Sequence, residues 1–280
     1  MNPTNIGRLR EMFKDKDSIS TTRAARVFEC SQQHVAKTLK DKCRIRCYKK
    51  KRIPKRTAQH LGKVRRLCGR LYRKLKGKSC VIDDEAYFTY AHSTINGNDN
   101  FYSDDLTQTP ANVKYRKVGK FESKMLVYMC FSDKGVSKPY FVPSGLAINQ
   151  KIYLDECIKK KLMPFINKYH SDGEYLFWPD LASSHYAKSV QAYLNEKNVN
   201  FVAREDNPPN VPECRPIENF WSIIKGKVYE GNWQAKSDDH LKARIQKCLN
   251  ELDRDLVQSL GKSTLRRLDN IRRNDVLENH

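Results

Sequence analysis

The chain has 280 residues, of which 39% are hydrophobic and 10% aromatic, enough to build a core-bearing domain and to exclude a disordered polyelectrolyte. The formal net charge of +21 points first to nucleic acid as a partner. There is no apolar run long enough to cross a membrane and no signal peptide, so we expect a protein of a reducing, non-membrane compartment. The nine cysteines form no C-x-x-C pair, which argues against a disulfide framework or a zinc cluster.

The charge is concentrated at the front of the chain. Residues 1–79 contain 25 Lys and Arg against 5 Asp and Glu, whereas residues 80–280 contain 28 against 27. The sequence therefore predicts a polycationic front part and a nearly neutral globular back part.

Residues 21–40 fit a helix–turn–helix. Ala25 lies where the two helices would touch, Ser31 is a suitable N-cap for the second helix, and Val35 and Leu39 would face inward. The alternative is a small helical bundle with a solvated polar face; the basic surroundings favour DNA binding. The outward residues that would read bases and phosphates are Gln32, Gln33 and Lys37.

A strongly basic segment, residues 43–56, follows the helices. It could track a phosphate backbone, lie in a minor groove, act as a nuclear localisation signal, or simply be a solvated linker. Residues 57–75 then have apolar side chains at helical spacing and predict a connecting helix. The candidate DNA contacts in the basic segment are Lys49, Lys50, Lys51, Arg52, Lys55 and Arg56.

From residue 80 the pattern changes to strands and helices. Strands are predicted at 81–90, 125–131, 140–143, 175–180 and 200–203, and helices at 148–170 (kinked or divided by Pro164), 184–197, 217–229, 238–252 and 256–271. This order favours an α/β fold with a mixed sheet and flanking helices. Residues 91–124 between the first two strands lack periodicity and predict either a DNA- or subunit-contacting loop or a disordered insertion.

Three acidic residues stand out because carboxylates are costly inside apolar strands unless they are paired or bind a metal. Asp84 interrupts the first strand, Asp180 ends the apolar run 175–180, and Glu218 opens the helix that follows a proline-rich segment. We expect Asp84, Asp180 and Glu218 to meet and hold divalent ions, Mg²⁺ or Mn²⁺. Two such ions can activate a nucleophile and stabilise the leaving oxygen at a phosphodiester.

Three motifs carry a resemblance to a known family. They are Asp84-Glu85 in an apolar strand, Asp180 followed five residues later by His185, and the segment 207–221 with Pro-Ile-Glu218 and an aromatic residue; 37 residues separate Asp180 from Glu218. In this order and spacing they resemble the motifs of mariner-like DNA transposases.

The resemblance implies a ribonuclease H-like catalytic domain that uses about two Mg²⁺ or Mn²⁺ ions. It also implies cleavage of double-stranded DNA at transposon ends, strand transfer into target DNA at a TA dinucleotide, and a homodimer in the nucleus. Asp84, Asp180 and Glu218 would be the catalytic metal ligands, and His185 would lie beside them. Asp84 is preferred to Asp83 because it directly precedes Glu85, as in the family motif.

One departure from the family is that only one helix–turn–helix is found where two are usual. A transposase is therefore the first hypothesis, and a truncated or host-reused DNA-binding protein without full transposition activity is the alternative. The predicted domains are a helix–turn–helix domain over residues 1–42, a basic linker and connecting helix over 43–79, and a ribonuclease H-like catalytic domain over 80–280.

Overall fold

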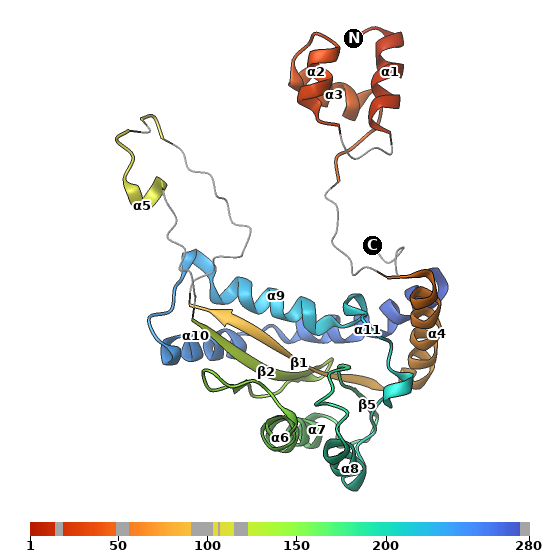
Figure 1. Cartoon of the computed structure of the whole chain (residues 1–280), viewed down its shortest axis with the longest axis vertical. Coiled ribbons are helices and arrows are strands. Elements are labelled where there is room, and N and C mark those ends of the chain that lie inside the picture. Colours follow the sequence, from red (N-terminus) through yellow and green to blue (C-terminus); the bar gives the residue numbers. More distant parts are fainter. Residues whose placement is uncertain (15–18, 49–55, 91–102, 106, 115–122, 275–280) are drawn as a thin grey trace. The chain divides into compact units, whose positions relative to one another are not determined.

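The computed structural model describes residues 1–14, 19–48, 56–90, 103–105, 107–114 and 123–274 (Figure 1). The chain divides into two compact units, Met1–Lys55 and Arg56–His280. No helix in these ranges is both long and apolar enough to cross a membrane.

The first unit is a three-helix bundle. It contains α1 (Pro3–Phe13), α2 (Thr21–Val27) and α3 (Gln32–Asp41), and α2 and α3 cover the segment predicted as a helix–turn–helix. Its core contains Leu9, Ala24, Ala25, Val35, Leu39 and Cys43.

Side-chain caps define where these helices begin. The hydroxyl of Ser31 accepts from the backbone N–H of His34, which confirms the predicted N-cap of α3. Glu29, in the turn, has φ of 50°, a left-handed conformation that explains why glycine would be the usual residue here.

The second unit is built on a five-stranded mixed sheet with the order β3-β2-β1-β5 and β4 paired to β2. β1 (Ser79–Thr89) is antiparallel to β2 (Lys124–Ser132) and parallel to β5 (Tyr175–Trp178). The short strands β3 (Gly135–Val136) and β4 (Tyr140–Phe141) extend the far side. This confirms the predicted α/β fold.

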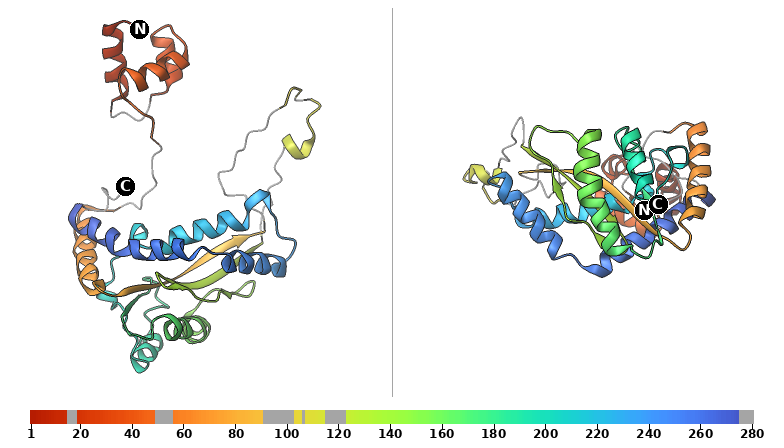
Figure 2. Two further views of the ribbon diagram at one scale, coloured as in Figure 1. Left: turned by 180° about the vertical axis from the view of Figure 1, so that it is seen from behind. Right: turned by 90° about the horizontal axis from the view of Figure 1, so that it is seen from below.

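Helices cover both faces of the sheet (Figures 1 and 2). One face packs against α4 (Ala58–Leu75), α9 (Pro216–Val228), α10 (Asp238–Asn250) and α11 (Arg254–Asn274). The predicted connecting helix α4 packs along α11 and shares this core, so it is part of the second unit rather than of a linker ending at residue 79.

The other face is covered by one long helical segment and by α8 (Lys188–Glu196). The long segment begins as α6 (Gln150–Ile152), widens into a π-helix over Tyr153–Leu162 and ends as α7 (Met163–Tyr169). Pro164 was predicted to kink or divide this helix; the π-helical turns end just before it, where the ring cannot donate a backbone hydrogen bond.

Two predicted elements are shorter than expected. The helix predicted from residue 184 begins at Lys188, because residues 184–187 form turns. The strand predicted at 200–203 is a single parallel bridge between Phe201 and Phe177. Residues 91–102, 106 and 115–122 of the predicted loop lie outside the described residues, and α5 (Ala111–Lys114) lies between them.

Candidate active site at the edge of the sheet

β1 points its neighbouring acids to opposite faces of the sheet, because side chains alternate along a strand. Ile82, Ala86 and Phe88 belong to the core under α9 and α11, and Val81 belongs to the core under the π-helix and α7. By this alternation Asp84 lies on the α9 side and Asp83 on the π-helix side.

Asp84 is a half-buried carboxylate held by α9. The indole Nε1 of Trp221 donates to Asp84 Oδ2 at 3.0 Å. Burial raises the pKa of Asp84 to about 7; the charge of Arg215 opposes this shift, and the negative charges of Glu218 and Glu85 add to it. A carboxylate with a raised pKa and a like-charged neighbour is a group that a cation would stabilise.

Glu218 lies in the first turn of α9 with an exposed side chain. Pro216 begins this helix, where its missing N–H costs nothing. Glu218, Trp221 and Lys225 follow one another at helical spacing, so they share one face of α9. The negative charge of Glu218 raises the pKa of Asp84, so the two acids are near enough to interact electrostatically.

Asp180 follows the end of β5. The parallel register pairs Ile82 with Trp178, so Asp84 and Asp180 lie two residues beyond the same pair on adjacent strands. The side chain of Asp180 is 40% exposed, and its carboxylate accepts from the backbone N–H of Ala182. The structure thus places the second acid at the level of the first.

The three acids do not form a closed metal cage. Across the described ranges there is no group of three His, Cys, Asp or Glu side chains arranged to hold an ion. Ionised carboxylates repel one another, so such side chains approach closely only when a cation neutralises them. The donor set nevertheless suits Mg²⁺ or Mn²⁺, because it offers carboxylate oxygens.

Asp83 has a different environment. It is fully buried, and its Oδ2 accepts hydrogen bonds from Tyr128 at 3.0 Å and from Tyr153 at 2.6 Å. Burial raises the pKa of Asp83, while the positive charge of His185 opposes this shift. This carboxylate is sealed inside the core, which supports the choice of Asp84 as the site residue.

His185 lies between Glu85 and Asp180. Its side chain is 1% exposed, its Nε2 lies 3.5 Å from Glu85 Oε1, and its Nδ1 lies 3.7 Å from Asp180 Oδ1. Its ring stacks on Tyr153 with a centroid separation of 3.9 Å. Burial disfavours the charged imidazole, but contact with Glu85 and the charges of Asp83 and Asp180 outweigh burial and raise the pKa of His185.

Two cationic residues near the acids, Arg215 and Lys225, were not identified from the sequence. Arg215 donates to the carbonyl oxygens of Asp83 at 2.7 Å and of Trp178 at 3.3 Å, tying β1 to the end of β5. Lys225 is half-buried near Glu218 and Asp84. Its position seven residues after Glu218, two helical turns along one face, was the signal available in the sequence.

Some of the predicted DNA-contacting residues are exposed on α3, and others lie outside the described residues. Gln33 and Lys37 are exposed on α3, whereas the amide of Gln32 donates to Thr21 Oγ1 at 2.9 Å and so also links the two helices. Lys49, Lys50, Lys51, Arg52 and Lys55 lie outside the described residues.

Arg56 corrects one prediction. Its side chain is 2% exposed and forms an ion pair with Glu213 at 3.0 Å, and it also donates to the carbonyl oxygen of Asn210. A buried guanidinium in this pairing is not presented to a phosphate. Arg56 instead anchors the proline-rich segment that leads to α9.

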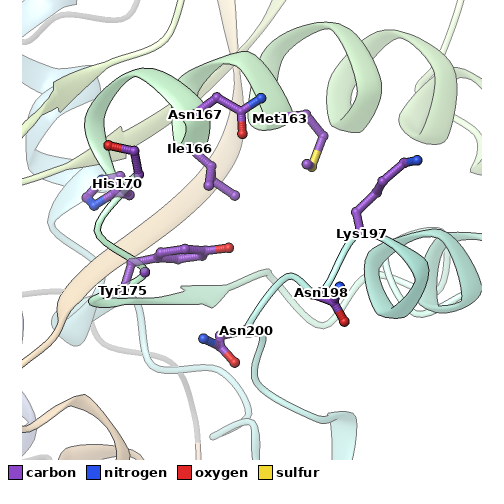
Figure 3. A pocket seen from close by; sticks show the side chains of 10 residues that line it. Met163, Ile166, Asn167, His170, Tyr175, Lys197, Asn198 and Asn200 are labelled. Carbon is purple, nitrogen blue, oxygen red and sulfur yellow. The ribbon is translucent and has the colours of Figure 1, made fainter.

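A separate pocket of about 410 Å³ lies away from the acids (Figure 3). Its lining includes Asn167 and His170 at the end of α7, Tyr175 at the start of β5, and Lys197 beyond α8. Asp180 follows the opposite end of β5, so this pocket is not part of the acidic site.

No protein-family model matches the chain. The Tc3 transposase of Caenorhabditis elegans is 27% identical over 190 residues, which cover 67% of this chain and 54% of that protein. The chain therefore spans about half the length of this curated relative.

Solved structures of the Mos1 transposase share the fold. The Mos1 paired-end complex with the left transposon end has a TM-score of 0.76 at 16% identity, covering 98% of this chain and 80% of that one. The Mos1 mariner catalytic domain has a TM-score of 0.59 at 14% identity, covering 80% of this chain and 98% of that one.

The mixed sheet and its helical layers share the fold of the Mos1 transposase catalytic domain, which agrees with the predicted fold class. The chain is thus similar in sequence to the Tc3 transposase and in fold to the Mos1 transposase, in agreement with the predicted resemblance to mariner-like DNA transposases.

Proposed function

We propose that the chain is a metal-dependent DNA transposase that cleaves DNA at transposon ends and joins the freed strand to target DNA, at a TA dinucleotide. The observation that carries the proposal is the pairing of Asp84 with Glu218 across β1 and α9, with Asp180 at the matching level of β5. These three carboxylates come from distant parts of the sequence to one edge of one sheet.

Asp84, Asp180 and Glu218 would hold Mg²⁺ or Mn²⁺, with two ions in the active site. When bound, such ions supply Lewis-acid activation of the attacking oxygen and stabilisation of the leaving oxygen. Mos1 crystal structures include paired-end complexes with Mn and with Mg, which supports this choice of ion.

The chain's own residues orient the acids. Trp221 holds Asp84 from α9, Arg215 joins β1 to the end of β5, and His185 restrains Asp180. Together they fix the first two acids relative to each other before a substrate arrives. Preorganisation of this kind lowers the reorganisation that the reaction requires.

The three-helix unit would bind double-stranded DNA through α3, with Gln33 and Lys37 on its exposed face. The basic segment 43–55 would add phosphate contacts and would direct the protein to the nucleus. The active assembly would be a homodimer that joins two transposon ends, in line with the paired-end complexes of Mos1.

The test is cleavage of DNA that carries the inverted repeats flanking the coding region, with Mn²⁺ present. We expect the wild-type chain to nick this DNA and Asp180→Asn to lose nicking while keeping DNA affinity. Asp239→Asn is the matched control, because Asp239 has a 91% exposed side chain on α10. Nicking by Asp180→Asn at the wild-type rate would contradict the assignment.

The second candidate is a DNA-binding protein without transposition activity. It would need only the basic front part of the chain, with Gln33 and Lys37 exposed on α3. Specific binding of the repeats without nicking in either Mn²⁺ or Mg²⁺ would select this alternative.

A further inference from the structure

Asp180 lies outside the regular elements of the fold. β5 ends at Trp178 and α8 begins at Lys188, and residues 179–187 form the turns and bends between them. The side chain of Asp180 is 40% exposed and accepts from the backbone N–H of Ala182 within the same loop. A metal ligand has to be held in place by the residues around it, so the loop needs an anchor from another part of the chain.

The side chain of Asn207 reaches this loop from the segment that precedes α9. It is 3% exposed, and its amide makes three hydrogen bonds. Its Oδ1 accepts from the indole Nε1 of Trp178 at 2.7 Å, and its Nδ2 donates to the carbonyl oxygen of Pro179 at 2.8 Å and to the hydroxyl of Tyr186 at 2.8 Å. One buried side chain therefore joins the last residue of β5, the peptide that leads into Asp180, and the other side of the loop.

The three partners of Asn207 require one acceptor and two donors, which is the set that an amide offers. An indole nitrogen can only donate and a carbonyl oxygen can only accept, so the orientation of the amide is fixed. The hydroxyl of Tyr186 already donates its proton to the carbonyl oxygen of Val202 at 2.9 Å, so it accepts from Asn207. An ionised aspartate would have no donor for Pro179 or Tyr186, and an aliphatic residue would leave all three partners without this bond inside the core.

The hydrogen bond to Pro179 acts on the backbone of Asp180. The carbonyl group of Pro179 and the N–H of Asp180 belong to one rigid peptide plane, so a bond that holds this oxygen fixes the plane that leads into Asp180. The hydroxyl of Tyr186 holds the other side of the loop, next to His185, whose Nδ1 lies 3.7 Å from Asp180 Oδ1. Asn207 acts on the backbone and not on the carboxylate, so its effect on the site is indirect.

We propose that Asn207 is a positioning residue, which holds the peptide between Pro179 and Asp180 and so keeps the Asp180 carboxylate at the level of Asp84 for a shared divalent ion. The inference rests on the proposed function, because it takes Asp180 as a metal ligand. Loss of a residue that supports a metal ligand costs about ten- to a hundredfold in metal affinity or activity.

The test measures Mn²⁺ binding by the full chain without DNA, from the electron paramagnetic resonance signal of free Mn²⁺. It also measures single-turnover nicking of the flanking-repeat duplex at increasing Mn²⁺ concentration. Asn207→Leu removes the three hydrogen bonds, and Asp180→Asn removes the proposed ligand. Ser132→Ala is the matched control, because its buried hydroxyl lies 2.9 Å from His170 Nε2, and the His170 ring contacts Tyr175 at the opposite end of β5.

We expect Asn207→Leu to bind Mn²⁺ about tenfold more weakly than wild type, and to need about tenfold more Mn²⁺ for half-maximal nicking. Its affinity for the duplex should stay unchanged, because a buried side chain offers no contact to DNA. Ser132→Ala should also lose thermal stability but keep the wild-type Mn²⁺ affinity. All measurements are made well below the melting temperature of each variant, which circular dichroism gives.

A folded Asn207→Leu protein with wild-type Mn²⁺ affinity would overturn the inference. So would an equal loss of Mn²⁺ affinity in Ser132→Ala, or Mn²⁺ binding that does not depend on Asp180. If Asn207→Leu does not fold, Tyr186→Phe decides, because it removes one partner of the amide and keeps the ring. Weaker Mn²⁺ binding by Tyr186→Phe supports the inference, and wild-type binding contradicts it.

The proposed function has a separate outcome in the same experiment. Wild type that binds Mn²⁺ through Asp180 but fails to nick the duplex would contradict a transposase, whereas the Mn²⁺ affinity of the Asn207 variant would still decide whether Asn207 positions Asp180.

Discussion

The two faces of β1 treat neighbouring carboxylates in opposite ways. Asp83 lies in a sealed core and receives hydrogen bonds from two tyrosines, whereas Asp84 is half-buried, receives one hydrogen bond from Trp221 and faces Glu218. Burial raises the pKa of both groups. A raised pKa therefore does not identify the reactive acid; access to solvent and to other acids does.

Asp83 therefore takes part in interactions within the core, whereas the charge of Asp84 lowers the stability of the folded chain. The two tyrosines donate to one oxygen of Asp83, so this carboxylate lies inside the core within a hydrogen-bonded network of neutral donors. Asp84 stays next to like charge, which is unfavourable for folding and favourable for binding a cation. Such a trade of stability for activity is typical of active sites.

The largest effect should be on DNA cleavage. We expect Asp84→Asn to lose nicking in Mn²⁺ by about a thousandfold or more, which is about 4 kcal/mol of barrier. Asp83→Asn keeps an acceptor for the tyrosines and should retain nicking within about tenfold. Single-turnover cleavage of one labelled duplex measures both. A larger loss in Asp83→Asn would reverse the assignment of the two acids.

The next effect concerns stability and its dependence on pH, measured with a chelator present. The fold raises the pKa of Asp84 from 3.8 to about 7, so it favours the protonated form. Between about pH 4 and pH 7 the unfolded chain loses this proton while the folded chain keeps it, and stability falls as pH rises.

Asp84→Asn removes that penalty, and we expect it to be more stable than wild type by about 2 kcal/mol above pH 7, allowing for partial exposure. The difference should vanish about one pH unit below 3.8, where the Asp84 carboxyl is protonated in both the folded and the unfolded chain. Denaturant unfolding at the two pH values measures it. The same difference in unfolding free energy at both pH values would mean that packing, and not the charge of Asp84, separates Asp84→Asn from wild type.

The smallest effect should come from the face of β1 that carries Asp83. Tyr153→Phe removes one of the two hydroxyls that donate to Asp83 and keeps the ring stacked on His185. We expect it to lower the free energy of unfolding by about 1 kcal/mol, the usual loss of one hydrogen bond. Tyr193→Phe on α8 is the control, because in the described residues its hydroxyl makes no hydrogen bond, while its ring packs against the core and lies near two lysine ammonium groups. Equal losses of unfolding free energy in Tyr153→Phe and Tyr193→Phe would mean that the hydrogen bond from Tyr153 to Asp83 adds no stability of its own.

The fold was largely predictable because its hydrophobic periodicity is strong. The strand over β1 and the N-cap at Ser31 follow from local patterns, and both are confirmed. The helix over residues 57–75 was predicted as a connecting helix, but its packing on α11 is a contact across about 200 residues that local sequence does not encode.

The candidate site was predictable in its acids but not in its surroundings. Asp84, Asp180 and Glu218 stood out as carboxylates in apolar contexts, and the choice between Asp83 and Asp84 came from a family motif. The roles of Arg215, Tyr153 and Trp221 depend on tertiary contacts, and Arg56 was misassigned because its partner Glu213 lies 157 residues away.

Because side chains alternate along β1, the position of an acid in the strand, odd or even, decides which face of the sheet it occupies. A single residue inserted into β1 between Ile82 and Asp83, with the register to β5 kept, would turn Asp83 toward α9 and Asp84 toward Tyr128 and Tyr153. The sequence would then still contain both carboxylates in the same order, yet the inward and outward acids would have exchanged places. Relatives that differ by one residue in this strand should therefore be aligned by the face each acid occupies and not by its neighbours in the chain.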